Sequence, residues 1–260
     1  MITIFCILIR CFCNTANLNS KADIFKNTTL KYQHLFFDLD HTLWDFDANA
    51  EESLAELYDF FKLEAKAIGP FNKFYSIYLN HNLTLWSRFE KGYITTEELK
   101  WRRMWRTLLD FQIADEKLAK DMSEYFLEVL PTKKKVFEYT FEILDYLTDK
   151  KYALHLITNG FEKTQRIKLE SSGLTKYFKN IITSEISNSV KPKKEIFEYA
   201  VNKAHGKIEE SIMIGDNLNA DILGAKNAGM DSVFVNHINA ACGEEPTYII
   251  RHLKELERIL

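Results

Sequence analysis

At residues 35–42 the sequence reads Leu35-Phe36-Phe37-Asp38-Leu39-Asp40-His41-Thr42, an apolar run that ends in two aspartates two positions apart. A short continuous apolar run predicts a buried strand. Side chains alternate across a strand, so both carboxylates leave the strand end in the same direction if the strand stops at Asp38. Two acids that close repel each other and require a cation or a proton. We therefore expect a chemical site here, with a solvated turn as the alternative.

Length and composition restrict the class of protein. The chain has 260 residues, 46% hydrophobic and 27% charged, which is typical of one large α/β domain or of a domain with a smaller one inserted. The net charge of -3 offers no basic surface for nucleic acid. We expect neither a nucleic-acid nor a membrane partner. A local cation or a metal could still favour a phosphorylated substrate.

The first thirty residues differ from the rest. The apolar segment 1–13 is too short to span a membrane and lacks the charged start and small-residue cleavage site of a secretory signal. We expect 1–30 to lie outside the fold, so that a start near residue 30 would give a compact domain. The cysteines are Cys6, Cys11, Cys13 and Cys242. Their distribution is not a disulfide framework and favours a reducing, cytoplasmic compartment.

Apolar runs and helical periodicity alternate in the second half of the chain. Strands are predicted at 34–39, 153–158, 180–183, 211–215, 232–235 and 248–250. Helices are predicted at 136–148, 162–171, 193–203 and 220–228. Strands that alternate with helices indicate a parallel sheet with crossover helices, which is an α/β fold.

The segment 45–131 shows helical periodicity and no convincing strand. Thr95-Thr96-Glu97-Glu98 has the spacing of a capping box at a helix start. An insertion of this length far exceeds an ordinary loop between a strand and a helix. We therefore expect a small all-helical domain, inserted directly after the strand that carries the two aspartates.

Two further strand ends carry polar groups. Thr158-Asn159-Gly160 follows the run 153–158, and there the hydroxyl can donate to a phosphate oxygen while the glycine lets the backbone approach an anion. An ordinary turn and helix cap is the alternative. Lys191-Pro192 precedes the helix at 193–203, where proline suits the first turn. Lys191 is either a surface charge or the cation that the acids need.

The fourth element is Asp216, which follows the apolar run 211–215. A carboxylate at a strand end can bind Mg²⁺. Asp221 comes five residues later and could instead be an acidic residue at a helix start. Each element is ambiguous alone, but ligands of open α/β sheets bind outside the carboxyl ends of the strands. Four such elements in this order predict one site.

This ordered set resembles the haloacid dehalogenase-like (HAD) hydrolase superfamily, from about residue 31 to residue 260. The insertion is similar to the family's helical cap. The resemblance implies a Rossmann-like parallel-sheet core at 31–44 and 132–260, with an inserted all-helical cap domain at 45–131. It also implies Mg²⁺ as cofactor. We expect a monomer or a homodimer.

Within that superfamily the chain is most similar to bacterial pyrimidine 5'-nucleotidases, at segments 85–95, 157–161, 191–197 and 221–225. This implies a phosphoric monoester hydrolase that acts on a small phosphorylated metabolite, a pyrimidine nucleoside 5'-monophosphate. A phosphoglycolate or sugar-phosphate phosphatase is the alternative, because cap residues set the substrate. A catalytically silent binding protein is a third. Asp40 argues against a dehalogenase, which needs no acid for an alcohol leaving group.

The resemblance also implies a role for each motif residue. Asp38 attacks phosphorus and forms an aspartyl-phosphate. Asp40 protonates the leaving oxygen and then takes a proton from water. Mg²⁺ is held by Asp38, Asp216 and the backbone carbonyl of Asp40. The phosphoryl oxygens are held by three groups: Thr158, the amide of Asn159 and Lys191.

The remaining predictions concern supporting residues. Asp221 and Thr42 are expected to lie behind the groups that contact metal and substrate, with Asp221 orienting Lys191 or a metal-bound water. In the cap, the candidates for substrate recognition are Trp86, Arg88 and Tyr93. Aromatic residues at helical spacing are more often part of a core, so this is the alternative for Trp86 and for Trp101 and Trp105.

Overall fold

The structure is a computed structural model that describes residues 31–66, 68–241, 243 and 245–260. The prediction that 1–30 lie outside the fold, and all four cysteines, fall outside the described residues. Residues 32–260 belong to one compact unit. The division of this unit at residues 45 and 131 into core and cap stays a prediction.

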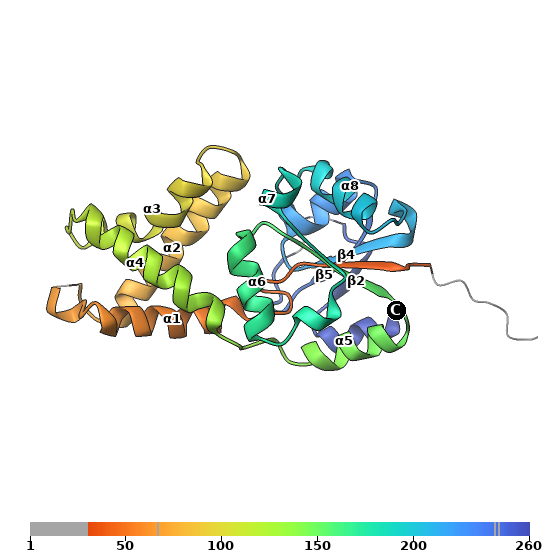
Figure 1. Ribbon diagram of the computed structural model, residues 1–260, viewed down its shortest axis with the longest axis horizontal. Coiled ribbons are helices and arrows are strands. Elements are labelled where there is room, and N and C mark those ends of the chain that lie inside the picture. The colour runs from red at the N-terminus through yellow and green to blue at the C-terminus, as the bar shows by residue number, and fades with distance from the viewer. Residues whose placement is uncertain (1–30, 67, 242, 244) are drawn as a thin grey trace, which may run out of the picture. The chain divides into compact units, whose positions relative to one another are not determined.

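A six-stranded parallel sheet forms the centre of the α/β fold, as predicted (Figure 1). The strands are β1 (His34–Phe37), β2 (Ala153–Thr158), β3 (Asn180–Thr183), β4 (Ser211–Gly215), β5 (Asp231–Val235) and β6 (Tyr248–Ile250). Their order in the sheet is β3-β2-β1-β4-β5-β6, and each neighbouring pair is parallel. The side chains of β2 and β4 are buried on both faces, apart from the partly buried Ala153, as is usual for the central strands of a parallel sheet covered by helices.

The strand order reverses beside β1. The chain runs outward from β1 through β2 to β3, and then returns to β4 on the other side of β1. Phe37 aligns with Ile214, and the Asp38 N–H donates to the carbonyl oxygen of Ile214 at 2.9 Å. A reversal of this kind leaves a crevice at the carboxyl ends of the strands, where ligands bind. The topology therefore places the ends of β1 and β4 at the expected site.

Helices fill the connection between β1 and β2 in the described residues. They are α1 (Phe46–Phe60), the 3₁₀ turn η1 (Glu64–Lys66), α2 (Phe71–Glu90), α3 (Thr96–Asp110), α4 (Glu116–Val129), η2 (Leu130–Thr132) and α5 (Thr140–Asp149). Helices α1–α4 pack against one another and form the group at the left of Figure 1. Helices α1 to α4 and the turn η1 fall within the predicted insertion at 45–131.

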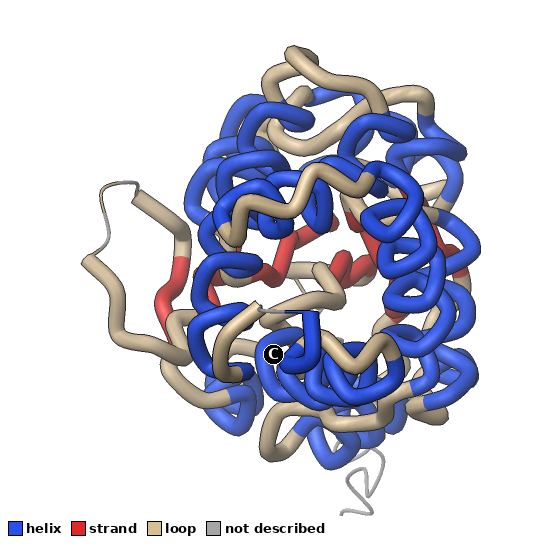
Figure 2. The backbone as a smooth tube through the Cα atoms, turned by 90° about the vertical axis from the view of Figure 1, so that its left-hand side faces the viewer, coloured by secondary structure: helices blue, strands red, loops and turns tan. Residues whose placement is uncertain are grey.

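The remaining helices surround the sheet. They are α6 (Glu162–Ser171), η3 (Thr175–Tyr177), α7 (Ser184–Ser187), α8 (Lys194–Lys203), η4 (Ile208–Glu210), η5 (Leu218–Leu223), α9 (Gly224–Asn227) and η6 (Leu253–Arg258). Helices α5 and α8 lie on opposite sides of the strands, and Figure 2 shows helices around the strands in a second view. None of the described helices is both long enough and apolar enough to span a membrane.

Two helix predictions differ from the structure. The helix predicted at 136–148 begins at Thr140, because Tyr139 has a left-handed backbone (φ 70°) and Val136 forms a β-bridge with Trp44. The helix predicted at 220–228 is instead η5, a π-helical turn, followed by α9. Such turns occur often at functional sites. Side-chain periodicity alone does not distinguish a π-helical turn from an α-helix.

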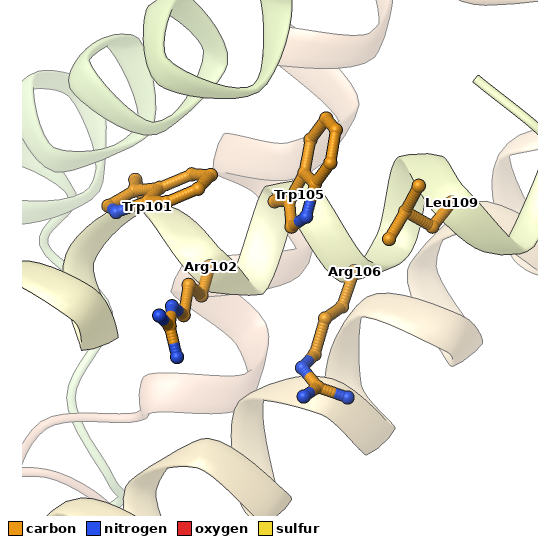
Figure 3. A pocket seen from close by; sticks show the side chains of 5 residues that line it. All are labelled: Trp101, Arg102, Trp105, Arg106 and Leu109. Carbon is orange, nitrogen blue, oxygen red and sulfur yellow. The ribbon is translucent and has the colours of Figure 1, made fainter. Parts of the chain in front are cut away.

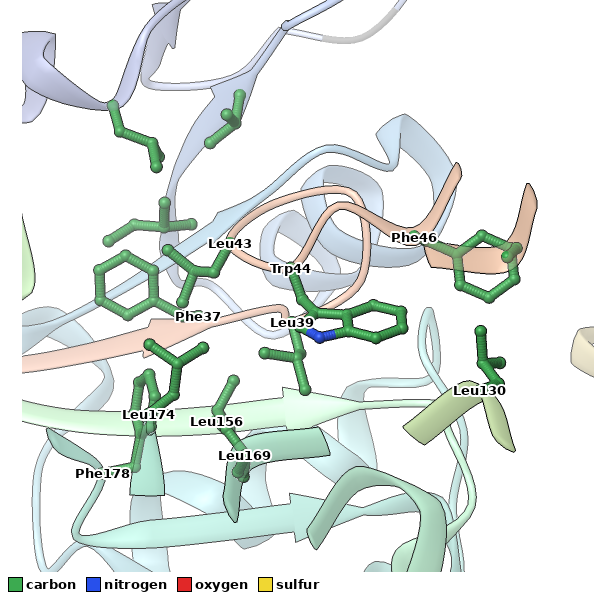
Figure 4. Packing of buried hydrophobic residues seen from close by; sticks show 14 of the residues in the cluster. Phe37, Leu39, Leu43, Trp44, Phe46, Leu130, Leu156, Leu169, Leu174 and Phe178 are labelled. Carbon is green, nitrogen blue, oxygen red and sulfur yellow. The ribbon is translucent and has the colours of Figure 1, made fainter. Parts of the chain in front are cut away.

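The loop after β1 is anchored in the core by apolar side chains that lie between and after the two aspartates. Leu39 and Trp44 are fully buried, and Figure 4 shows them among the core side chains with Leu156 of β2 and Leu169 of α6. Burial of a large apolar side chain stabilises the fold by about 1.5–3 kcal/mol. The core therefore holds the backbone that carries Asp38 and Asp40.

Candidate active site

Lys191 is the central cation of the site, and its side chain is buried. Its ammonium donates to Asp38 Oδ1 and to Asp221 Oδ1, each at 2.6 Å. A third hydrogen bond goes to the carbonyl oxygen of Ile157 at 2.9 Å. An ammonium has three donors and no acceptor, so all three are used. Lys191 thus joins the end of β1 to η5.

The motif Thr158-Asn159-Gly160 lies beside Lys191. The Asn159 side-chain amide donates to the Lys191 carbonyl oxygen at 3.0 Å, and the Lys191 N–H donates to Asn159 Oδ1 at 2.8 Å. These bonds fix the backbone from which the lysine side chain extends. Thr158 Oγ1 accepts from the Gly160 N–H at 3.1 Å. Its own hydroxyl hydrogen is still available for another acceptor.

Asp216 follows β4, and its Oδ1 accepts a hydrogen bond from the Thr42 hydroxyl at 2.9 Å. Both oxygens of Asp221 are engaged, because Oδ2 accepts from the Asn217 N–H at 3.0 Å. A Cβ at Gly215 would lie 2.2 Å from Asp221 Oδ2, so only glycine leaves room for that carboxylate. Gly215 at the end of β4 thus allows Asp221, as well as Asp216, to lie in the site.

The site carries an excess of negative charge. Burial raises the pKa of Asp38. The charge of Lys191 lowers this pKa, whereas the charges of Asp221 and Asp216 raise it further. Lys191 also pairs with Asp221, so it offsets only part of the increase. Burial, and then Asp221, raise the pKa of Asp216 to about 7. Burial alone would lower the pKa of Lys191, but Asp221 and Asp38 hold it above its usual value. Lys191 therefore stays charged.

A divalent cation fits this donor set. Oxygens of Asp38, Asp216 and Asp221 lie within 4.8 Å of one another. Three carboxylates against one ammonium leave two negative charges, and Mg²⁺ prefers carboxylate oxygens. Asp221 already uses both oxygens on Lys191 and Asn217. Asp38 and Asp216 are therefore the better side-chain ligands for a metal, and the predicted set of metal ligands stays a prediction.

Asp40 has different partners from Asp38. Lys168 Nζ donates to Asp40 Oδ1 at 2.6 Å, and Gln165 Nε2 donates to Asp40 Oδ2 at 2.9 Å. The Asp40 side chain is 23% exposed, whereas that of Lys168 is 2% exposed. The two aspartates of the first motif thus have separate lysine partners. Asp40 is free of the acidic cluster and partly open to solvent.

Sequence reasoning missed Gln165 and Lys168. A usable signal was present, since they lie three residues apart in the helix predicted directly after Thr158-Asn159-Gly160. Residues three apart share a helix face, and the start of this helix lies at the carboxyl edge of the sheet. The same face could have been expected to meet the site.

Glu90, at the end of α2, was missed as well. Burial raises the pKa of its carboxyl, while a hydrogen bond with the Asn159 side chain and the charge of Lys191 act in the opposite direction. The helical insertion therefore brings a carboxyl group next to the motif residues of the sheet. No local pattern marks this residue, because its neighbours are about 70 and 100 positions away in the sequence.

The predicted recognition residues of the insertion have different surroundings. The Trp86 ring stacks on Phe161, the residue after Gly160, with 5.7 Å between ring centroids. Phe161 is buried among apolar residues of α2 and α3, such as Leu85 and Leu99. Arg88 and Tyr93 are exposed. Their part in substrate recognition stays a prediction.

Trp101 and Trp105 line a different pocket. It has a volume of about 280 Å³, and its lining residues all belong to α3: Trp101, Arg102, Trp105, Arg106 and Leu109 (Figure 3). The two indole rings lie 6.0 Å apart. None of the lining residues is a motif residue, so this pocket adds nothing to the acidic site.

Comparison with known proteins shows the family to which this chain belongs. The model of the haloacid dehalogenase-like hydrolase family matches residues 32–229. The chain is 31% identical over 228 residues to pyrimidine 5'-nucleotidase PynA of Streptococcus pneumoniae, which covers 86% of this chain and 93% of that protein. It is 29% identical to pyrimidine 5'-nucleotidase YjjG of Escherichia coli, over 89% of this chain and 99% of that protein.

A solved structure is similar over most of the chain. It is the crystal structure of the HAD-hydrolase YfnB from Bacillus subtilis bound to magnesium. The TM-score is 0.80 at 31% identity, and the match covers 88% of this chain and 99% of that one. The shared architecture therefore includes the helical insertion as well as the sheet.

Proposed function

Because this chain belongs to the haloacid dehalogenase-like hydrolase family, we propose that it is a Mg²⁺-dependent phosphomonoesterase that hydrolyses pyrimidine nucleoside 5'-monophosphates through an aspartyl-phosphate. The observation that carries the proposal is the contact of Lys191 with Asp38 and Asp221 at the reversal of the sheet, next to Asp216. The two nucleotidase relatives support the substrate class.

Asp38 is the nucleophile in this proposal. Its carboxylate lies at the carboxyl end of β1, and Lys191 fixes its Oδ1. The free Oδ2 attacks phosphorus as the ester bond to the leaving oxygen breaks. The Thr158 hydroxyl then donates to a phosphoryl oxygen while charge moves from the nucleophile to the leaving group. Lys191 stabilises this charge through its own positive charge, because its three hydrogen bonds are already used. Asn159 contributes by fixing the backbone of Lys191.

Asp38 and Asp216, with the carbonyl oxygen of Asp40, would hold Mg²⁺, which when bound would neutralise negative charge between the nucleophile and the phosphate. The hydroxyl of Thr42 orients Asp216 for this role. Asp221 orients Lys191 through its Oδ1. These two contacts support the proposal that Thr42 and Asp221 act behind the groups that contact metal and substrate.

Asp40 is the proton carrier. Its carboxyl group gives a proton to the leaving oxygen, and the resulting carboxylate then takes a proton from the water that attacks the aspartyl-phosphate. Its position outside the acidic cluster and its partial exposure to solvent suit a group that meets both the leaving group and water.

The substrate class is tested by phosphate release with Mg²⁺ from UMP, dUMP, dTMP, AMP, phosphoglycolate and a hexose phosphate. We expect kcat/KM to be highest for the pyrimidine monophosphates. A preference for phosphoglycolate or the sugar phosphate would retain the chemistry and replace the substrate class by the alternative. No release from any of them would favour a silent binding protein.

A further inference from the structure

Helix α6 holds Asp40 by two side chains. Lys168 Nζ donates to one carboxylate oxygen at 2.6 Å and Gln165 Nε2 to the other at 2.9 Å. Both α6 side chains are buried, whereas Asp40 is partly exposed. We name the pair Gln165 and Lys168 the α6 clamp. The mechanism described above uses neither residue.

Apart from Asp40, the surroundings of the Lys168 ammonium are mainly aromatic rings. The ammonium lies 4.3 Å from the ring centroid of Trp44 and 5.4 Å from that of Phe46. Ring faces attract a cation, but a buried lysine is rare unless it is paired with an acid. Asp40 provides that acid. The surroundings of Lys168 therefore direct its charge to one carboxylate.

Gln165 is held in place at a cost in stability. Its Oε1 is buried and has no hydrogen-bond partner among the described residues. A buried acceptor without a partner costs about 1–3 kcal/mol. A Cβ at Gly160 would lie 1.7 Å from Gln165 Nε2, so the glycine of the second motif leaves room for this amide. Such an arrangement calls for a role other than stability.

We propose that the α6 clamp positions Asp40 for proton transfer. Each oxygen of Asp40 receives one hydrogen bond and retains one lone pair, on which the proton is carried. In the first step this proton moves to the leaving oxygen while its bond to phosphorus breaks and the bond from Asp38 forms. In the second step the carboxylate takes a proton from water while water oxygen binds phosphorus and the bond to Asp38 breaks. The inference rests on the proposed phosphatase function.

The test compares two esters in Lys168→Met, which keeps the aliphatic volume and removes the charge. The alkyl ester UMP requires a proton on its leaving oxygen, whereas p-nitrophenolate leaves as an anion. The parameter kcat/KM reports the steps up to release of the leaving group. We expect kcat/KM to fall about 10²-fold or more for UMP and less than about fivefold for p-nitrophenyl phosphate, since general acid catalysis contributes about 10²–10⁴-fold.

Lys163→Met is the matched control, because Lys163 is an exposed lysine of the same helix. It should leave both values unchanged. Lys168→Arg, which keeps the charge, should recover part of the UMP rate. Thermal melting checks that each variant folds, and Gln165→Met provides the same comparison if Lys168→Met does not fold.

Equal losses for the two esters would mean that Lys168 is merely structural and would overturn the clamp while leaving the phosphatase function intact. Unchanged rates for both would overturn it as well. A wild-type protein that hydrolyses neither ester would instead overturn the proposed function, and the clamp with it.

Discussion

Asp38 and Asp40 show how two identical side chains, two positions apart, acquire different chemistry. Asp38 is buried with Lys191 in a cluster of acids, so burial raises its pKa and a cation is needed nearby. Asp40 points to α6 and partly to solvent. Their shared position after an apolar strand predicted that both are functional. Their different partners, Lys191 and Lys168, come from distant parts of the sequence, so the strand alone does not predict them.

Asp38→Asn tests the nucleophile, because the amide keeps the size of the side chain and cannot form the aspartyl-phosphate. We expect kcat/KM for phosphate release to fall more than about 10³-fold, since no other group replaces a covalent nucleophile. Asp149→Asn, an exposed residue at the end of α5, should be unchanged. A variant at Asp38 that retains a tenth of the activity would exclude this mechanism.

Glu90→Gln tests the charge that α2 brings to the site. A negative charge beside Asn159 and Lys191 disfavours a leaving group that is itself anionic. Removal of about 1 kcal/mol of repulsion should raise kcat/KM for phosphoglycolate about fivefold relative to UMP. The exposed Glu124→Gln serves as control. An unchanged ratio would show that the leaving group does not meet Glu90.

At the scale of elements, local sequence signals and the structure agree closely at the strands. Four of the six predicted strands have the observed bounds, because short apolar runs between turn residues are local features. Helix starts depend on caps, and the capping box predicted at Thr95 is present: its hydroxyl accepts from the Glu98 N–H, and the Glu98 carboxylate accepts from the Thr95 N–H.

Thr95→Ala should destabilise α3, because the variant leaves the Glu98 N–H without its side-chain partner. The expected loss is about 1 kcal/mol in the free energy of unfolding, measured with urea. Thr96→Ala, one position further, removes no cap and should remain within about 0.5 kcal/mol of the wild type. Equal effects of the two substitutions would mean that the cap contributes nothing to stability.

At the scale of the whole molecule, the charges of the site affect the free energy of unfolding. Asp38, Asp216 and Asp221 bring like charges together at the ends of strands that are far apart in the sequence. Any cation that binds only the folded chain therefore stabilises it by mass action. A proton that binds a histidine only in the unfolded chain destabilises the folded chain by the same mass action.

Mg²⁺ should raise the melting temperature of the protein. At a concentration one hundred times the dissociation constant, the stabilisation is about 2.7 kcal/mol. Differential scanning fluorimetry measures the shift, and EDTA should reverse it. Asp216→Asn should reduce the Mg²⁺-dependent shift because it removes a proposed ligand. A shift of the same size in that variant would place the ion elsewhere.

His155 in β2 should make the fold sensitive to mild acid. Its ring stacks on Phe36, and its Nε2 lies 3.2 Å from Nδ1 of His34. Burial, with charges of His34 and Lys179, lowers the pKa of His155 to about 4. Between pH about 6.5 and about 4 the unfolded chain binds the proton that the folded chain does not. The free energy of unfolding therefore falls as the pH falls, by at most about 1.4 kcal/mol per pH unit.

Urea unfolding at pH about 7.5 and about 5 measures this effect. His155→Gln should lose less stability between the two pH values than the wild type does. His205→Asn, at an exposed histidine, should lose as much as the wild type. If His155→Gln and the wild type lose the same amount, another group causes the acid sensitivity.

The sequence by itself determined the parallel α/β sheet, the helical insertion and four motifs, three of them at strand ends and Lys191-Pro192 just before α8. It could do so because apolar periodicity and the residues that end a strand are local properties of the chain. Only the tertiary structure decided that Lys168 and Gln165 hold Asp40, and that Glu90 reaches Asn159. These contacts join residues that are 69 to 128 positions apart, and no local pattern encodes them. They depend on where helix packing places each side chain.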